Sequence, residues 1–246
     1  MPHIEIAAET LFSIFGFPVT NTLVMTWIVL VLLVYAAYRI SCTISIIPKT
    51  LQSIAEIIIE KFLGLMEGMM GSRTVAERYI PIVATIFIFI LISNWFGILP
   101  GVGSIGVYEQ HGAQQKFVPF FRSAASDLNV TLALGTLAVL LINITGMAVK
   151  GVGGHINNFF SLRNPIDAFV GLLEFISEFA KIISFSFRLF GNIFAGEVLL
   201  IIVGFLAPFA APIPFLMLEL FVGFVQALVF AMLTMVFISI AVATHH

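Results

Sequence analysis

One arginine stands in the middle of a long apolar segment, where a permanent charge needs a partner. Arg188 belongs to the stretch SFSFRLFGN, residues 184–192. A charged side chain at the centre of a bilayer costs about 2.5–3.5 kcal/mol on insertion scales, and a guanidinium cannot lose its proton to escape that cost. Its neighbours within one helical turn include no carboxylate. The negative charge must therefore come either from across the chain, most directly from Glu219, or from another protein.

The polar residues of this segment fall on one stripe if the segment is helical. Their spacings are mostly three, four or seven, and a helix turns by about 100° per residue, so the stripe covers roughly 100° of arc. Its members are Asp167, Glu174, Ser177, Glu178, Lys181, Ser184, Arg188 and Asn192. Within it, we expect Lys181 to form a structural ion pair with Glu178 or Glu174.

Two further carboxylates lie on faces turned away from the arginine. Glu197 is about 140° from Glu174 on the same helical wheel, and Glu219 precedes Gln226 by seven residues in the next apolar segment. Carboxylates at membrane depth typically mark ion or proton routes. A fixed positive charge beside two titratable groups is the arrangement expected of a proton path with an electrostatic gate.

The composition indicates that these residues lie in a membrane protein. Of 246 residues, 60% are hydrophobic and 10% are charged, whereas a soluble domain has about 25% charged residues. The net charge of −2 and the absence of a strongly basic region argue against a nucleic-acid partner. The single cysteine excludes an internal disulfide.

Five apolar segments are long enough to cross or deeply penetrate a hydrocarbon core of about 30 Å. They span residues 22–40, 80–99, 128–149, 166–207 and 213–243. Such segments must be helical, because lipid offers no partners for an open backbone. Residues 50–71 mix acids with apolar residues at helical spacing, which predicts an amphipathic helix lying at the interface. The sequence thus predicts an all-α polytopic membrane protein, with residues 1–246 forming a single membrane domain.

The fourth segment is too long for a simple crossing. A helix over its 42 residues would measure about 63 Å, roughly twice the hydrocarbon thickness. Ordinary tilt cannot absorb this excess, so the helix must either break or lie steeply inclined against a partner. Pro208, Pro212 and Pro214 then turn the chain, and residues 166–243 are predicted to form a long tilted helical hairpin.

Lysine and arginine placement predicts the orientation. No basic residue precedes the first segment, whereas its last residues and the stretch before the second segment hold Arg39, Lys49, Lys61, Arg73 and Arg78. Because basic residues gather on the cytoplasmic side, we expect the N-terminus outside, five crossings and the C-terminus in the cytoplasm.

Other motifs point to no further chemistry. GVGSIG at 101–106 has the letters of a dinucleotide fingerprint, but that motif requires a preceding strand and a following helix, and here a loop is expected. His245 and His246 end the chain without convergent ligands, so no metal site is predicted. No set of Ser, His and Asp or of Cys and His suggests hydrolysis, so we expect neither a catalytic site nor a cofactor.

The segment SFSFRLFGNIFAGEVLL closely resembles the signature of subunit a of F-type ATP synthases, the stator channel of the membrane sector. ISNWFGILPG at 92–101, DLNVTLALG at 127–135 and LELFVGFVQALVFAMLTMVFISIA at 218–241 are also similar to this family. The resemblance covers nearly the whole chain.

The resemblance implies a role for each polar position. In this family the hairpin curves round a rotating ring of c subunits, and the arginine, here Arg188, faces an essential carboxylate on each passing subunit. Two aqueous half-channels reach the ring from opposite sides, and the arginine separates them. Positions matching the outer half-channel are Asn192, Glu197, Glu219 and Gln226, and those matching the cytoplasmic one are Glu174 and Ser177.

By the same resemblance, the chain translocates protons to and from the ring carboxylates and has no catalytic site of its own. Its expected partners are the c-ring, the peripheral-stalk b subunits, the rest of the ATP synthase and membrane lipid. The membrane would be a bacterial plasma membrane or that of an energy-transducing organelle. Glu219 stands where some members have His, and Phe237 where some have Tyr, which leaves the order of the outer relay open.

Four alternatives are considered at this stage. A membrane-embedded enzyme would need a nucleophile or a metal cluster, which the sequence does not suggest. A sodium-coupled version of the same subunit would differ mainly on the ring. A self-contained ion transporter would need inverted repeats and broken helices in both halves, and the sequence has no such symmetry. A purely structural anchor would not need Arg188.

Overall fold

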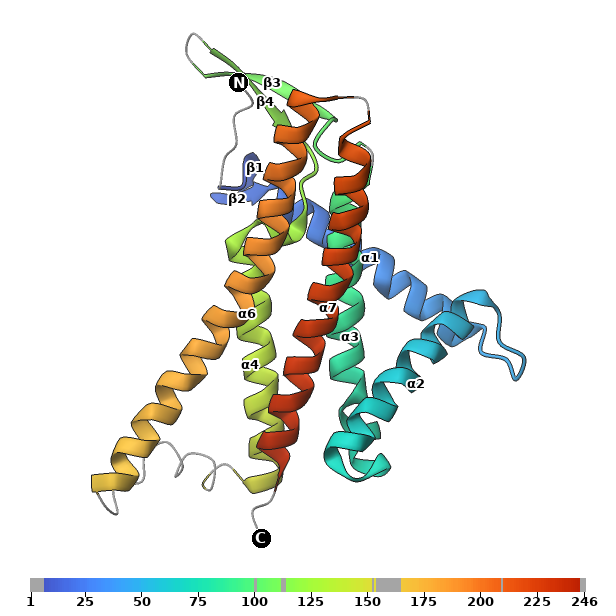
Figure 1. The fold of residues 1–246 in the computed structure, drawn as a ribbon, viewed down its shortest axis with the longest axis vertical. Helices are drawn as coiled ribbons and strands as arrows, with labels where there is room; N and C mark the ends of the chain where they lie inside the picture. The colour runs from blue at the N-terminus through green and yellow to red at the C-terminus, as the bar shows by residue number, and fades with distance from the viewer. Residues whose placement is uncertain are drawn as a thin grey trace.

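Long helices dominate the computed structural model, which describes residues 7–99, 101–111, 114–151, 153, 165–208 and 210–243. Five helices in this part of the chain are long and apolar enough to cross a membrane. They are α1 (Asn21–Cys42), α3 (Arg73–Ile98), α4 (Leu128–Lys150), α6 (Pro165–Leu206) and α7 (Pro212–Val242) (Figure 1). The predicted helical membrane architecture is confirmed.

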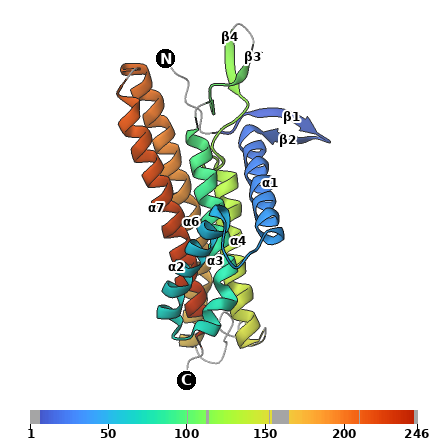
Figure 2. The same cartoon turned by 90° about the vertical axis from the view of Figure 1, so that its right-hand side faces the viewer.

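The core lies where α3, α4, α6 and α7 meet. Val83 and Ile90 of α3, Ala138 of α4, Leu189 of α6 and Met235 of α7 are each at most 1% exposed. In the view turned by 90°, α6 and α7 lie on one side of α3 and α4, and α1 lies on the opposite side (Figure 2). Lipid is as apolar as the core, so such helices associate by close van der Waals packing.

A glycine allows the closest approach between α4 and α6. A Cβ atom at Gly135 would lie 2.5 Å from Ser186 Oγ and 3.0 Å from the Ile182 carbonyl oxygen. Ser186 is fully buried and donates a hydrogen bond of 2.7 Å to that same carbonyl. Only glycine fits between the two helices here, and this contact sets the position of α6 against the bundle.

The helical hairpin consists of α6 and α7, and α6 is one continuous helix of 42 residues. Of the two possibilities that the sequence left open, the structure excludes a break. The N-terminal half of α6 diverges from α4 and α7 (Figure 1). Its large apolar side chains are exposed there, including Phe169, Leu172, Leu173, Phe175, Ile176 and Phe179.

The predicted amphipathic helix is α2 (Thr50–Met70). Its buried residues Phe62, Leu63 and Met66 belong to the same core as α3, and Gly71 ends it in the left-handed conformation (φ 69°), a common helix cap. The helix α1 leaves the bundle obliquely and is joined to α2 through residues 43–49 (Figure 1). The location of α2 at a membrane interface stays a prediction.

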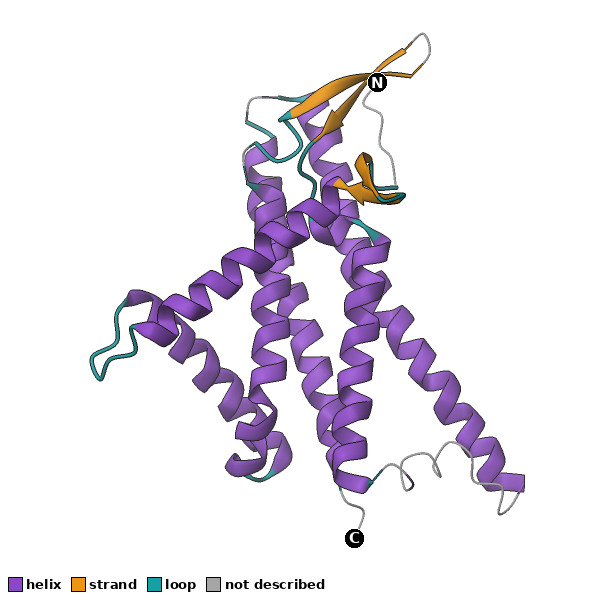
Figure 3. Cartoon of the chain, turned by 180° about the vertical axis from the view of Figure 1, so that it is seen from behind, coloured by secondary structure: helices purple, strands orange, loops and turns teal. Residues whose placement is uncertain are grey.

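Two short β-hairpins were not predicted. β1 (Thr10–Ile14) pairs with β2 (Phe17–Thr20), and β3 (Gly106–His111) pairs with β4 (Gln114–Pro119), both antiparallel. They lie at the end of the bundle that carries the α6–α7 turn, hereafter the turn end (Figure 3). Residues 101–105 form turns before β3, and β3 is followed by a strand. The expected loop at GVGSIG therefore leads into a hairpin rather than a dinucleotide-binding helix.

Replacing Gly135 with leucine should destabilise the protein by about 1–3 kcal/mol, because the added side chain must push α4 from α6. The matched control is Gly64→Leu on α2, where an added Cβ meets no heavy atom within 4 Å. The thermal midpoint of the detergent-solubilised chain measures the effect. A midpoint for Gly135→Leu equal to that of the control would contradict the close approach.

Candidate functional site

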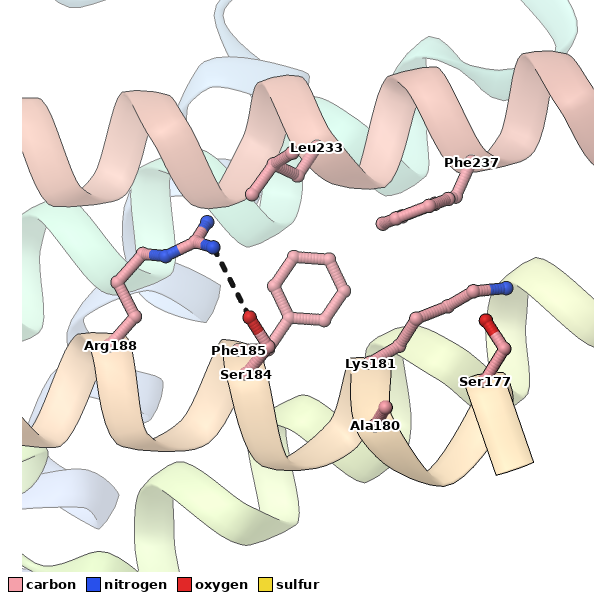
Figure 4. A pocket seen from close by; sticks show the side chains of 8 residues that line it. All are labelled: Ser177, Ala180, Lys181, Ser184, Phe185, Arg188, Leu233 and Phe237. Atoms are coloured by element: carbon pink, nitrogen blue, oxygen red, sulfur yellow. Dashed lines mark hydrogen bonds between the residues drawn. The ribbon is translucent and has the colours of Figure 1, made fainter. Parts of the chain in front are cut away.

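Arg188 lies on an exposed face of α6, beside α7. Its Nη2 atom donates a hydrogen bond of 3.2 Å to Ser184 Oγ, one turn earlier. The guanidinium borders a groove of about 260 Å³ between the two helices, as the close view shows (Figure 4). The groove is lined by Ser177, Ala180, Lys181, Ser184, Phe185, Arg188, Leu233 and Phe237.

In the described part of the chain, no carboxylate forms an ion pair with Arg188. Glu219, the in-chain candidate, lies instead against Gly196 on another part of α6. Among the described residues, the guanidinium is therefore bound only to a neutral hydroxyl, in a segment apolar enough to span a membrane. Such a charge is stable at membrane depth only if a partner or water meets it.

Small side chains surround Arg188 on its exposed face. Ser184 and Gly191 flank it, and further exposed small residues on α6 are Ser177, Ala180 and Ala195. Small residues at a helix surface let another helix approach closely in a membrane. The stripe that carries Arg188 therefore leaves room for close approach, and Arg188 is its positive charge.

The other cation of the stripe is neutralised within the chain. Lys181 Nζ pairs with Glu178 Oε1, and not with Glu174, which is exposed. Asn143 of α4 donates a hydrogen bond of 3.0 Å to the second Glu178 oxygen, and the Lys181 ammonium lies 4.8 Å from the centre of the Phe237 ring. The contribution of Asn143 depends on packing between helices, so spacing along one helix could not reveal it.

A second and larger cavity, of about 740 Å³, lies at the turn end. Glu197 of α6 and Glu219 of α7 both line it, together with Asn94 near the end of α3 and Arg122. Arg122 comes shortly before the short 3-10 helix η1 (Ala124–Ser126). The structure thus brings the two predicted carboxylates into one cavity, apart from the groove at Arg188.

Glu219 is buried, with 8% of its surface exposed, and its Oε2 atom has no hydrogen-bond partner among the described residues. A Cβ atom at Gly196 would lie 2.9 Å from the other carboxylate oxygen, Oε1, so the glycine makes room for this side chain. Asn94 Oδ1 and Ser123 Oγ, from two other lining residues, are likewise buried and unpaired in the described part. A cavity lined by such oxygens suits hydrogen-bonded water and an exchangeable proton.

Glu197 has a partner that the sequence analysis missed. Arg122 Nε lies 3.1 Å from Glu197 Oε1, although the two residues are 75 positions apart. In the sequence, Arg122 stands in a loop between apolar segments, where nothing links it to Glu197. The only hint in the sequence that Arg122 belongs to the site was its position shortly before the DLNVTLALG stretch, which resembles the family.

The remaining predicted positions lie outside both cavities or at their edges. Asn192 is exposed one turn after Arg188, Gln226 is partly buried on α7, and Glu174 is exposed on the diverging half of α6. Ser177 lines the groove at Arg188. Within the described ranges, no three residues among His, Cys, Asp and Glu gather as a metal site; His245 and His246 lie outside those ranges.

A comparison with protein families decides the identity. The family described as the ATP synthase A chain matches residues 21–239, most of the chain. The chain belongs to this family. The resemblance found in the sequence is thereby confirmed, and the protein is an integral membrane-sector subunit of an ATP synthase.

Several members of the family are similar to the chain over most of their length, each of them called ATP synthase subunit a. The protein of Moorella thermoacetica is 32% identical over 235 residues, which is 96% of each chain. That of Mycobacterium ulcerans is 34% identical over 90% of this chain and 84% of its own. That of Campylobacter fetus is 30% identical over 87% of both.

Replacing Gly196 with alanine should displace the Glu219 carboxylate while leaving the fold intact, because the three atoms nearest to the added methyl belong to the flexible Glu219 side chain. We expect ATP-driven proton transport to slow by about threefold or more, since small displacements of a reacting group are costly. Gly204→Ala, on the same helix with nothing within 4 Å of the added atom, is the control. Equal transport rates in the two variants would show that the placement of Glu219 is unimportant.

Proposed function

We propose that this subunit conducts protons between the two sides of the membrane and a ring of c subunits, and that Arg188 separates the two half-channels. One observation carries the proposal: Arg188 is exposed, charged and without a carboxylate partner in the described part of its own chain. The missing negative charge is then the carboxylate of a c subunit. The small residues around Arg188 allow the helix that bears it to come close.

The larger cavity serves as the outer half-channel. A proton entering it is passed by Glu197 and Glu219 to the carboxylate of a ring subunit, on a path that Asn192 and Gln226 flank. Once neutralised, that carboxylate can face lipid at acceptable cost. Glu219 suits the last transfer, because it is buried and its Oε2 atom, unpaired among the described residues, can bind a proton.

The groove between α6 and α7 begins the cytoplasmic half-channel. A ring carboxylate that meets the Arg188 guanidinium is held ionised by the opposite charge and releases its proton past Ser177 toward Glu174. Arg188 keeps its own charge throughout, so no proton can pass directly from one cavity to the other. Each charge that crosses gains about 2.3 kcal/mol per 100 mV of membrane potential, which drives ATP synthesis elsewhere in the complex.

The orientation follows from charge placement. Arg73 and Arg78 begin α3 at the end of the bundle opposite the α6–α7 turn (Figure 1), and residues 207–211 of the turn contain no basic residue. By the positive-inside rule, the turn end faces outward and the C-terminus lies in the cytoplasm. The relatives named above come from bacteria, which favours a bacterial plasma membrane. The c-ring and the peripheral-stalk b subunits are the expected neighbours.

Replacing Arg188 with alanine should reduce ATP-driven proton pumping to background while the complex still assembles. Arg188→Lys should fail as well, because an ammonium lacks the planar fork and can lose its proton. Arg73→Ala, which removes exposed ion pairs with Glu67 and Glu77, is the matched control and should pump normally.

Pumping is measured in inverted membrane vesicles with a pH-sensitive dye, and assembly by the amount of complex that is purified. Coupled pumping by assembled Arg188→Ala complexes would refute the proposed role.

A further inference from the structure

We propose that Arg122 is a positioning residue of the outer half-channel: it fixes the Glu197 carboxylate in the larger cavity and acts on proton uptake through that carboxylate. The inference rests on the proposed function. It adds a second permanent positive charge to the mechanism, at the turn end of the bundle rather than at the ring.

The Arg122 guanidinium donates hydrogen bonds to both oxygens of the Glu197 carboxylate. Arg122 Nε lies 3.1 Å from Glu197 Oε1 and 3.4 Å from Oε2, and Nη2 also lies 3.4 Å from Oε2. Such forked pairs fix the orientation of a carboxylate as well as its location. Lysine, with one compact charge, cannot reproduce this geometry.

The pair is largely shielded from solvent. The side chain of Arg122 is 9% exposed and that of Glu197 is 28% exposed, compared with 61% and 54% for the surface pair of Arg73 and Glu77. Exposed pairs contribute little, but removing one partner of a buried pair leaves an uncompensated charge. The position of the Glu197 carboxylate therefore depends on Arg122 more strongly than the position of a group in an exposed surface pair depends on its partner.

Buried hydrogen bonds fix the backbone that follows Arg122 and link it to two helices. The next residue, Ser123, accepts a hydrogen bond of 2.9 Å from Ser126 through its carbonyl oxygen. Asp127 then caps α4 by accepting from the Asn129 amide at 2.8 Å, and it accepts from Thr22 of α1 at 2.8 Å.

The N-terminal segment adds a further contact, because Arg122 Nη1 donates to the Ala7 carbonyl at 3.2 Å. The charge thus stands on a rigid part of the fold, as a positioning role requires.

Within the described ranges, the charged groups that line this cavity are Arg122, Glu9, Glu197 and Glu219. Glu197 is held by Arg122, whereas Glu219 has a buried oxygen with no hydrogen-bond partner in the described part of the chain. The two carboxylates are therefore not equivalent. Arg122 keeps Glu197 fixed at its place along the cavity wall, so a proton arriving from outside meets a carboxylate of constant position before it reaches Glu219.

The test is a double-mutant cycle on the assembled complex in proteoliposomes. The rate of ATP synthesis is measured against pH on the side of the turn end, with pH on the other side held constant, for Arg122→Gln, Glu197→Gln and the pair. Arg122→Gln should change the proton concentration at half-maximal rate by about threefold or more, and this change should vanish in the Glu197→Gln background. The dependence on pH at the other side should not move. Arg73→Gln is the control.

Equal effects of Arg122→Gln in both backgrounds, or no effect in either, would overturn the proposal. If Arg122→Gln does not assemble, Arg122→Lys decides: an assembled complex with altered dependence on pH at the turn end supports positioning, and failure of this variant to assemble, or unaltered dependence, overturns it. If Glu197→Gln alone left transport unchanged, the proposed outer half-channel would fail together with this inference. If Arg122→Gln and Glu197→Gln each slowed transport and their effects were additive, only this inference would be refuted and the proposed function would stand.

Discussion

A guanidinium that cannot lose its charge stands on the open face of a membrane helix, and the rest of the site is arranged around the need to neutralise it. Arg188 is bonded to Ser184, and the described carboxylates of its own chain are engaged or placed elsewhere: Glu178 with Lys181, Glu197 with Arg122, and Glu219 against Gly196. An unpaired charge at membrane depth is costly. In the proposed function, a neighbouring c subunit supplies the missing carboxylate, and this dependence would tie the subunit to that neighbour in the membrane.

The fold keeps the groove at Arg188 apart from the larger cavity that holds the two carboxylates. The groove at Arg188 lies between α6 and α7, and the cavity that holds Glu197 and Glu219 lies at the turn end. Close packing of the helices at Gly135 and Gly196 fixes α6 against α4 and α7. The continuous 42-residue α6 carries the arginine and one carboxylate of the second cavity on a single rigid element, so their spacing along the helix is constant. In the proposed mechanism, this constant spacing helps to keep the two half-channels apart.

Periodicity and hydropathy predicted the helical architecture well, because in lipid each backbone group must be bonded within its own segment. The stripe on α6 and the resemblance around Arg188 also supplied the candidate residues of the site, whose roles stay predictions. What they could not predict depends on contacts between distant segments. Arg122 and Glu197 are 75 residues apart, and Asn143 meets Glu178 across two helices. The two β-hairpins were missed because strands of four to six residues, paired only with each other, leave too short a pattern to distinguish from loops.

The most direct test of the central claim is the distance from the Arg188 guanidinium to the nearest carboxylate in a structure of the whole membrane sector. The account predicts that this carboxylate belongs to a c subunit and lies within about 4 Å, or is bridged to the guanidinium by a single water, in at least one position of the ring. An Arg188 that is paired with Glu219, or with any other carboxylate of its own chain, and that faces lipid rather than the ring would contradict it.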